Sequence, residues 1–231
     1  MKITFHYKAV FAAVALTLGL LSCVKNNDDY NQPDVSGLSL INAVPNTEKL
    51  DVYINNSKAT ATDFAFGTKQ DYLNVYSGTR TISVTKQGNG TKLKTEDFIL
   101  KPRVGYSLFV LEKLEDPKFL FLEDELSRPT AGNGKVRFVN ASEDAGQLTF
   151  IVEGQATDFF PTKPYMGYTD FKTVPSANVA SFFVKDSNGL IVGSLKNVKI
   201  ENQKIYTIYA KGLIANSSEL TRFALSLFTH Q

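Results

Sequence analysis

A repeated stretch constrains this chain more than any other feature of its sequence. Residues 136–141 match residues 38–43 in their apolar pattern, and both segments end in an Asn-Ala pair. After six further residues each is followed by a second apolar stretch, 50–54 or 148–152, at the same offset of 98 residues. Such a period sets the number of units that must fold. We therefore predict two copies of one fold.

The two copies stay aligned toward their ends, which predicts the domain layout. Residues 170–174 match 71–75 at an offset of 99, and 205–209 match 105–109 at an offset of 100. The offset between the copies increases only between the apolar segments, where loops tolerate insertion. Because the connecting segment contains proline and glycine, we expect few contacts to cross it. The predicted layout is a first sandwich at 37–126, a linker at 127–134 and a second sandwich at 135–231.

The apolar pattern within each copy is typical of β-strands. Leu50, Val52 and Ile54 alternate with their neighbours at the period of two that a half-buried strand requires. Gly88-Asn89-Gly90 supplies residues suited to a hairpin turn. Short strands at this spacing predict an all-β fold of two tandem sandwiches, immunoglobulin-like or transthyretin-like. The chain has no Trp and a single Cys, so the core residues of antibody domains are missing and both types stay open.

Composition excludes several classes of protein. Without Lys2 and Lys8, which lie in a predicted signal peptide, the chain has 23 basic and 23 acidic residues, so we expect no nucleic-acid partner. His6 lies in the same peptide and His230 is the second-to-last residue, where chains fray. Zinc sites and a Ser–His–Asp arrangement are therefore not expected. No glycine-rich phosphate loop is present. We predict no cofactor, no metal site, no catalytic residue and no enzyme activity.

The N-terminus has the pattern of a secretory signal. Residues 9–21 form an apolar run behind Lys2 and Lys8, and the run is too short to span a bilayer. We predict a signal peptide at 1–22. The next residue is Cys23, and 20–23 resemble the lipobox of bacterial lipoproteins, in which the cysteine carries the lipid. Cys23 is therefore the predicted lipidation site, and its acyl chains would give a lasting membrane anchor.

A polar tether follows the predicted lipid. Residues 23–36 include Pro33 and have no apolar periodicity, which is typical of a flexible linker. Asp28-Asp29 resembles the acidic signal that sends some lipoproteins to the outside of the outer membrane, although a solvated linker accounts for the same residues. We predict a cell-envelope location as an outer-membrane lipoprotein, periplasmic or surface-exposed.

The repeat resembles the family named domain of unknown function 4397. The resemblance rests on Asn42-Ala43-Val44-Pro45 followed by the alternating strand 50–53, on 140–144 with 148–151 in the second copy, and on Tyr106 and Tyr206. It covers residues 37 to about 228 and departs at Thr149 and Ala177. The resemblance implies a tandem-repeat lipoprotein and no agreed activity.

Several residues are candidates for ligand contact. The densest acidic patch, Glu123-Asp124-Glu125 with three acids upstream, would suit glycoside hydrolysis only if two carboxylates shared a cleft. Sequence spacing does not indicate a shared cleft, so a charged strand end and loop is the favoured interpretation. Asn42 and Asn140 are more typical of residues that satisfy backbone groups at a strand end. Six tyrosines could stack on sugars or pack in strands. They are Tyr53, Tyr72, Tyr76, Tyr165, Tyr168 and Tyr209, and the upstream acids are Glu112, Glu115 and Asp116.

Together these observations predict a lipid-anchored cell-envelope protein that acts as a binding, adhesion or structural module. The alternative is a lipoprotein that captures glycans or small ligands for an outer-membrane uptake system. The expected partners are the membrane, through the lipid anchor, and a glycan or a protein ligand. The sequence does not identify the ligand-binding residues, which remain unknown from it alone.

Overall fold

The structure is a computed structural model that describes residues 34–60, 63–216 and 218–230. The predicted signal peptide and Cys23 lie outside these residues. Asp34–Gln231 form one compact unit. No described residue belongs to a helix capable of crossing a membrane. The described residues form fifteen strands: β1 Val35–Asn42, β2 Leu50–Ile54, β3 Ser57–Lys58, β4 Lys69–Tyr76, β5 Gly78–Lys86, β6 Lys92–Leu100, β7 Gly105–Lys113, β8 Asp116–Asp124, β9 Asn133–Asn140, β10 Thr149–Val152, β11 Lys172–Pro175, β12 Ala177–Lys185, β13 Ile191–Ile200, β14 Ile205–Lys211 and β15 Ala224–His230.

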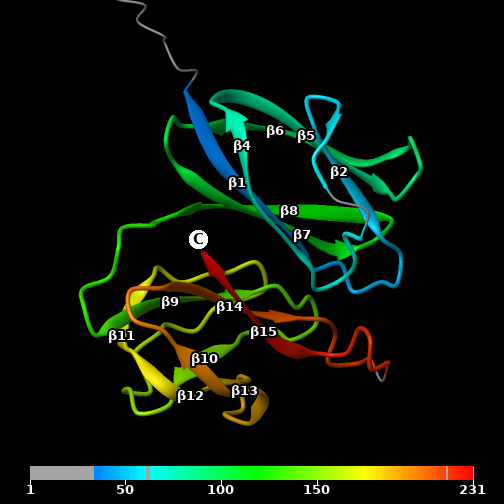
Figure 1. Ribbon diagram of the computed structural model, residues 1–231. Helices are drawn as coiled ribbons and strands as arrows, with labels where there is room; N and C mark the ends of the chain where they lie inside the picture. Colours follow the sequence, from blue (N-terminus) through cyan, green and yellow to red (C-terminus); the bar gives the residue numbers. More distant parts are fainter. Residues whose placement is uncertain (1–33, 61–62, 217, 231) are drawn as a thin grey trace, which may run out of the picture. The chain divides into compact units, whose positions relative to one another are not determined.

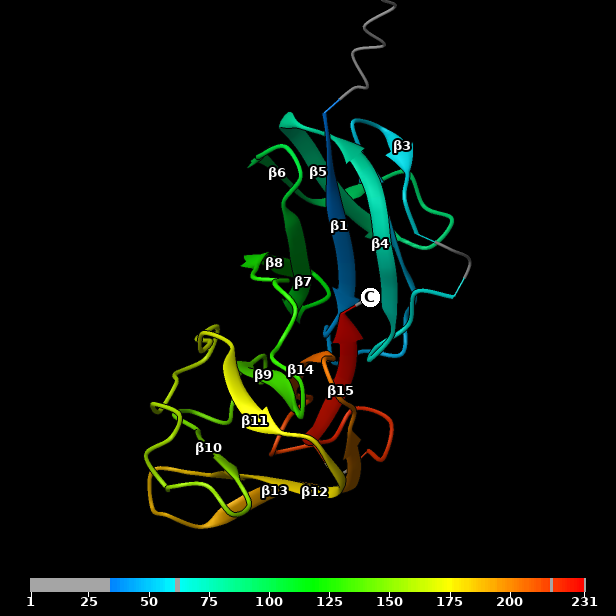
Figure 2. The same ribbon diagram turned by 60° about the vertical axis from the view of Figure 1, so that its left-hand side comes forward.

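The first copy is a sandwich of two four-stranded sheets. One has the order β4-β1-β7-β8 and the other β3-β2-β5-β6. Strand β1 lies between β4, to which it is antiparallel, and β7, to which it is parallel (Figure 2). Strands β2 and β3 are joined by Asn55 and Asn56, both at positive φ, as a tight two-residue hairpin requires.

The second copy repeats this topology. Its sheets have the orders β11-β9-β14-β15 and β10-β12-β13 (Figure 1). Strand β9 is parallel to β14 and antiparallel to β11, as β1 is to β7 and β4. Strand β11 has four residues where β4 has eight. The all-β prediction of two tandem sandwiches is therefore confirmed.

The strand order separates the two sandwich types that the sequence left open. In the immunoglobulin order the first two strands share a sheet. Here β1 and β2 lie in opposite sheets, so the transthyretin-like alternative is the one that remains. The predicted second linker boundary is corrected by two residues, because β9 begins at Asn133 rather than after Gly134.

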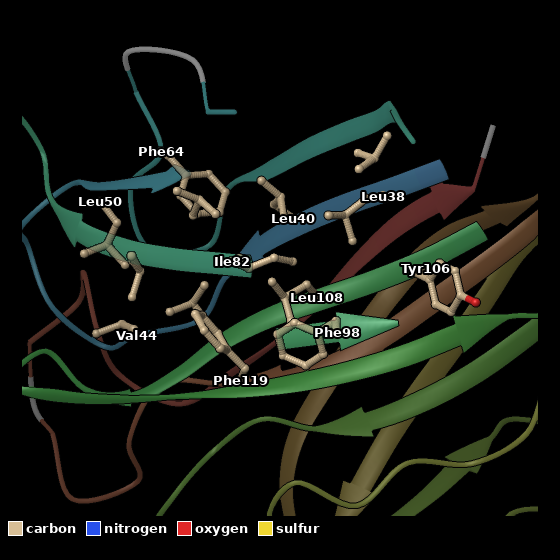
Figure 3. Close-up of a cluster of buried hydrophobic side chains, with 14 of the residues drawn as sticks. Leu38, Leu40, Val44, Leu50, Phe64, Ile82, Phe98, Tyr106, Leu108 and Phe119 are labelled. Carbon is tan, nitrogen blue, oxygen red and sulfur yellow. The ribbon is translucent and has the colours of Figure 1, made fainter. Parts of the chain in front are cut away.

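Each sandwich has its own apolar core between its sheets. In the first copy, Leu38, Leu40 and Leu108 meet Ile82 and Phe98 from the opposite sheet (Figure 3). The second core is richer in aromatic rings: Phe138 stacks on Phe150 at 4.8 Å between centroids, and further phenylalanines surround this pair. These cores follow from the inward side chains of the predicted alternation.

Candidate functional site

A third apolar cluster joins the two sandwiches. Ile41, Phe109 and Leu122 on the outer face of the first sandwich pack with Val139 and residues of the second, all of them buried. The complete cluster of buried residues is Ile41, Ala43, Phe109, Leu111, Leu120, Leu122, Val139, Ala141, Tyr209 and Phe228. The sheet that holds β1 and β7 is therefore buried on both faces, as the near-continuous burial of β7 shows.

Equivalent positions of the two copies meet in this interface. Ile41 corresponds to Val139 at the repeat offset, and Phe109 to Tyr209. The rings of Phe109 and Tyr209 lie 5.6 Å apart in an edge-to-face arrangement. An interface in which two copies use the same surface patch is isologous, as in a twofold dimer. The two sandwiches are thus packed as the subunits of a homodimer would be, within one chain.

A buried ion pair lies beside the apolar cluster. Arg137 Nη2 lies 2.6 Å from Asp124 Oδ1, and both side chains are almost completely inaccessible to solvent. Arg137 also donates through Nε to Thr207 Oγ1 at 2.8 Å and through Nη2 to Ser107 Oγ at 3.0 Å, and its guanidinium stacks on Phe171. Burial lowers the pKa of Arg137 and the charge of Asp124 opposes that shift. The pair links β8 of one sandwich to β9 of the other.

His230 belongs to the same polar cluster, so the expectation that the chain end frays here is wrong. The residue lies in β15, where it pairs with Ile205 of β14, and it is 5% exposed. Its ring nitrogens lie 2.6 Å from Tyr72 Oη and 2.7 Å from Thr207 Oγ1. Burial, followed by the positive charges of Arg137 and Lys69, lowers its pKa to about 2. The imidazole is therefore neutral and forms part of a buried hydrogen-bonded network.

We expect this histidine to make the protein acid-sensitive. Between its folded pKa of about 2 and the ordinary value of about 6.5, only the unfolded chain binds the extra proton. Stability is therefore lost as the pH falls below about 6.5, by roughly 2–3 kcal/mol at pH 4.5. Urea unfolding of wild type and His230→Gln at pH 7 and pH 4.5 measures this loss. A pH-dependent loss of equal size in both proteins would contradict the assignment.

The linker is held against the second sandwich by several hydrogen bonds, whereas the sequence predicted that few contacts would cross it. Arg128 Nη2 donates to Gln203 Oε1 at 2.6 Å, and Gln203 Nε2 donates to the Pro129 carbonyl at 3.2 Å. Lys135 pairs with Glu125 and donates to the Ser127 carbonyl. Together with the shared apolar cluster, these bonds exclude a free hinge between the copies.

The residues that the sequence suggested as ligand contacts differ in their contacts and exposure in the structure. Asn42 Nδ2 donates to the Phe64 carbonyl, and Asn140 Nδ2 donates to the Gly146 carbonyl, which confirms their backbone role. Tyr209 is buried in the interface, and Tyr165 donates to Glu112. Tyr53 and Tyr72 are partly buried. The tyrosines that remain exposed are Tyr76, at 61%, and Tyr168, at 44%.

Four of the six acids in the acidic patch are paired with cations. Asp124 is buried against Arg137, while Glu123 is exposed and pairs with Lys101 at 2.8 Å. Glu112 pairs with Lys118. These contacts support the charged strand end rather than a hydrolytic pair, although Glu123 and Glu125 do border a cavity of about 230 Å³ beside Tyr168. Among the described residues, no cluster of His, Cys, Asp and Glu could hold a metal ion.

The candidate functional site is a cleft at the open edge of the first sandwich, between β3 and β4. It has a volume of about 380 Å³ and an apolar floor that includes Ile54, Leu73 and Val75. Its polar rim carries two cations and no carboxylate. The rim consists of Asn55, Ser57, Lys58, Asn74, Tyr76 and Arg80. Such a mixture of apolar floor and convergent polar groups is typical of a ligand site.

Arg80 is fixed at one end of this cleft. Its Nε donates to the Tyr76 carbonyl at 2.6 Å and its Nη2 donates to the Ser77 carbonyl at 2.7 Å. It has no carboxylate partner among residues 34–230 that the structure describes. Asn55 accepts a hydrogen bond from the Thr81 amide through Oδ1. The cleft therefore presents a positioned cation and amide groups to a ligand.

The second sandwich has a cleft at the equivalent place with different chemistry. Its volume is about 280 Å³, and Val152, Pro175 and Val179 stand where Ile54, Tyr76 and Arg80 stand in the first copy. Glu153 is its charged residue. The duplication thus left a cationic, aromatic rim on one copy alone. The sequence analysis named Tyr76 as a candidate but did not name Arg80. The aligned position in the second copy is Val179, and this difference between the copies is the signal that could have identified Arg80.

Solved structures similar to this chain are β-domain proteins. The carbohydrate-binding module CBMbc (family CBM26) from Eubacterium rectale Amy13K, in complex with maltoheptaose, is 9% identical with a TM-score of 0.27, covering 85% of this chain and 97% of its own. The fimbrial anchor protein Mfa2 from Porphyromonas gingivalis is 10% identical with a TM-score of 0.25, covering 84% and 97%. A putative cell adhesion protein from Bacteroides ovatus is 8% identical with a TM-score of 0.23, covering 87% and 96%.

The family comparison is more specific. No curated protein matches the sequence. The family described as Domain of unknown function (DUF4397) matches residues 36–151, a stretch that runs from the second residue of β1 through the linker and β9 to the third residue of β10. The match therefore contains both partners of the buried ion pair, Asp124 and Arg137. The chain belongs to the DUF4397 family.

Proposed function

We propose that this protein is a binding module of the cell envelope that takes its ligand in the cleft between β3 and β4. The observation that carries the proposal is the cleft itself, with its apolar floor and its rim of amides, Tyr76 and Arg80. The contacts named above give the buried Ser107, Asp124 and His230 a structural role. They form a hydrogen-bonded network between the sandwiches.

The anchoring part of the proposal rests on the sequence. Cys23 stands at the end of the apolar run, and about ten polar residues separate it from the first strand. We expect Cys23→Ala to abolish incorporation of labelled palmitate and to release the protein from the membrane fraction, because the thioether-linked lipid has no other cysteine to join. Labelling that persists in the variant would contradict a lipid anchor at this position.

Binding is tested with a glycan and protein array on the soluble chain from residue 24. We expect the array to identify a ligand that binds wild type. The affinity for this ligand should fall at least tenfold in Arg80→Met, because that change removes the positioned cation. Val179→Met is the matched control at the equivalent position of the second cleft and should leave binding unchanged. A ligand whose affinity is unaffected by Arg80→Met would place binding elsewhere.

A glycan-capture role in an outer-membrane uptake system is the second candidate. It is favoured by the exposed ring of Tyr76 beside the amides Asn55 and Asn74, because an aromatic face and amide groups suit the two sides of a sugar ring. In that case Tyr76→Ala should weaken binding on the glycan array about as much as Arg80→Met does. Retained glycan binding in Tyr76→Ala would exclude stacking on this ring.

A further inference from the structure

The edge of β4 that faces the cleft carries unpaired backbone groups. Strand β4 pairs with β1 only, over its eight residues. The Ser77 amide donates to the Asp34 carbonyl at 2.9 Å, so it faces β1. Because backbone groups alternate in direction along a strand, the N–H groups of Tyr76 and Asn74 face away from β1, toward the cleft. Arg80 reaches the Tyr76 carbonyl from that side.

These groups have no protein partner in the part of the chain that the structure describes. No backbone hydrogen bond involves the N–H of Asn74 or Tyr76, or the carbonyl of Asn74. Unpaired groups along a strand edge are a template for another strand. Beside this edge lies an apolar floor, which includes Ile54, Leu73 and Val75. The edge therefore offers both hydrogen bonds and a place for apolar side chains.

The second copy shows how the same edge is blocked. There the equivalent strand β11 has four residues and ends in Pro175, which has no N–H to offer. Proline and short edge strands are the devices by which proteins prevent strand addition. The first copy has Tyr76 at the aligned position and a strand twice as long. Of two otherwise equivalent edges, one is closed to a further strand and the other is open.

Charge indicates the chemistry of the strand that would fit. The first cleft is lined by Lys58, which pairs with Asp51 at 2.7 Å, and by Arg80, which has no carboxylate partner among the described residues, whereas Glu153 is the charged residue of the second cleft. Arg80 lies at the edge itself, bound to the Tyr76 carbonyl. A guanidinium held in this way is suited to bind a carboxylate of a ligand.

We propose that an extended acidic peptide adds to the outer edge of β4 as a further strand, with apolar side chains on the cleft floor and a carboxylate on Arg80. This deepens the proposed function, on which it rests, by naming the ligand class. Main-chain hydrogen bonds would supply the affinity, and the alternation of apolar and acidic side chains would supply the specificity.

The test uses a capped seven-residue peptide in which valine alternates with glutamate, labelled for fluorescence anisotropy, and the soluble chain from residue 24. We expect saturable binding that falls at least tenfold in Tyr76→Pro, which copies Pro175, and stays within about threefold in Tyr76→Ala, which keeps the N–H. The peptide with lysine in place of glutamate should bind at least tenfold more weakly. Hydrogen exchange at the Asn74 and Tyr76 amides should slow on binding.

The peptide can also be altered, which keeps the test independent of how a variant folds. The peptide can be N-methylated at alternate backbone nitrogens, on the edge that would pair with β4. This change leaves the side chains of the peptide intact and should abolish binding. Equal binding of the methylated peptide, or equal weakening by Tyr76→Pro and Tyr76→Ala, overturns strand addition. If the peptide fails while an array glycan binds and depends on Arg80, this inference falls and the proposed function stands. If neither binds, both fall.

Discussion

Replacing Asp124 with Asn is expected to lower the free energy of unfolding by about 3–5 kcal/mol, because it leaves the buried Arg137 without its counter-charge. The carboxylate is fully buried and accepts from Ser107 and Tyr72 as well as pairing with Arg137. The amide has nearly the same shape, so the change tests charge rather than packing. Urea unfolding at pH 7 measures the loss.

The adjacent residue provides the matched control. Glu123 pairs with Lys101 at 2.8 Å, but both side chains are more than half exposed, so Glu123→Gln should cost less than about 1 kcal/mol. The double variant Asp124→Leu with Arg137→Met should recover much of the loss, because it removes both buried charges together. A loss in Asp124→Asn no larger than that in Glu123→Gln would show that the pair is not buried in solution.

Replacing Phe109 with Ala is expected to destabilise the protein by about 3–5 kcal/mol, the usual cost of deleting a buried aromatic ring. Phe109 is fully buried, and its ring lies 5.6 Å from that of Tyr209 and 6.2 Å from that of Phe228, both in the other sandwich. Because the lost contacts are those between the sandwiches, thermal unfolding should also separate into two transitions. Calorimetry of the variant measures both effects.

An exposed residue of the same sandwich provides a control for the general effect of a substitution by alanine. Ile99 is 73% exposed on β6, and Ile99→Ala should change stability by no more than about 0.5 kcal/mol and leave the unfolding transition single. If Phe109→Ala lowers stability but keeps one transition, the ring supports the first sandwich rather than the interface.

The sequence was sufficient for the architecture of each copy, because local rules determine it. The alternation of Leu50, Val52 and Ile54 correctly predicted the strand that β2 forms. The repeat offset located the second copy without any knowledge of its fold. The role of Asn42 and Asn140 was also predictable, since an amide at a strand end has few other partners.

The interface between the copies was not predicted, although β7 carries a signal for it. Leu108-Phe109-Val110-Leu111 is a continuous apolar run rather than an alternation, and such runs indicate strands buried on both faces. Periodicity cannot say what covers the second face. Asp124 belongs to the first copy, and Arg137 and His230 belong to the second, so only the packing of one copy on the other brings the ion pair and the neutral imidazole together.

The cleft was missed for a similar reason. Tyr76 could be named as an aromatic candidate from the sequence. Arg80, however, lies in a different sheet from Tyr76, and Asn55 belongs to a hairpin turn of that second sheet. Their convergence depends on how the two sheets of the sandwich are stacked, which strand patterns alone do not specify.

Calorimetry of the soluble wild-type chain tests most directly whether the two sandwiches form one cooperative unit. The shared apolar cluster and the buried ion pair predict a single transition in which the calorimetric and van't Hoff enthalpies agree. A calorimetric enthalpy about twice the van't Hoff value, or two resolved transitions in wild type, would mean that the copies unfold independently. That result would contradict an interface that couples the unfolding of the two sandwiches.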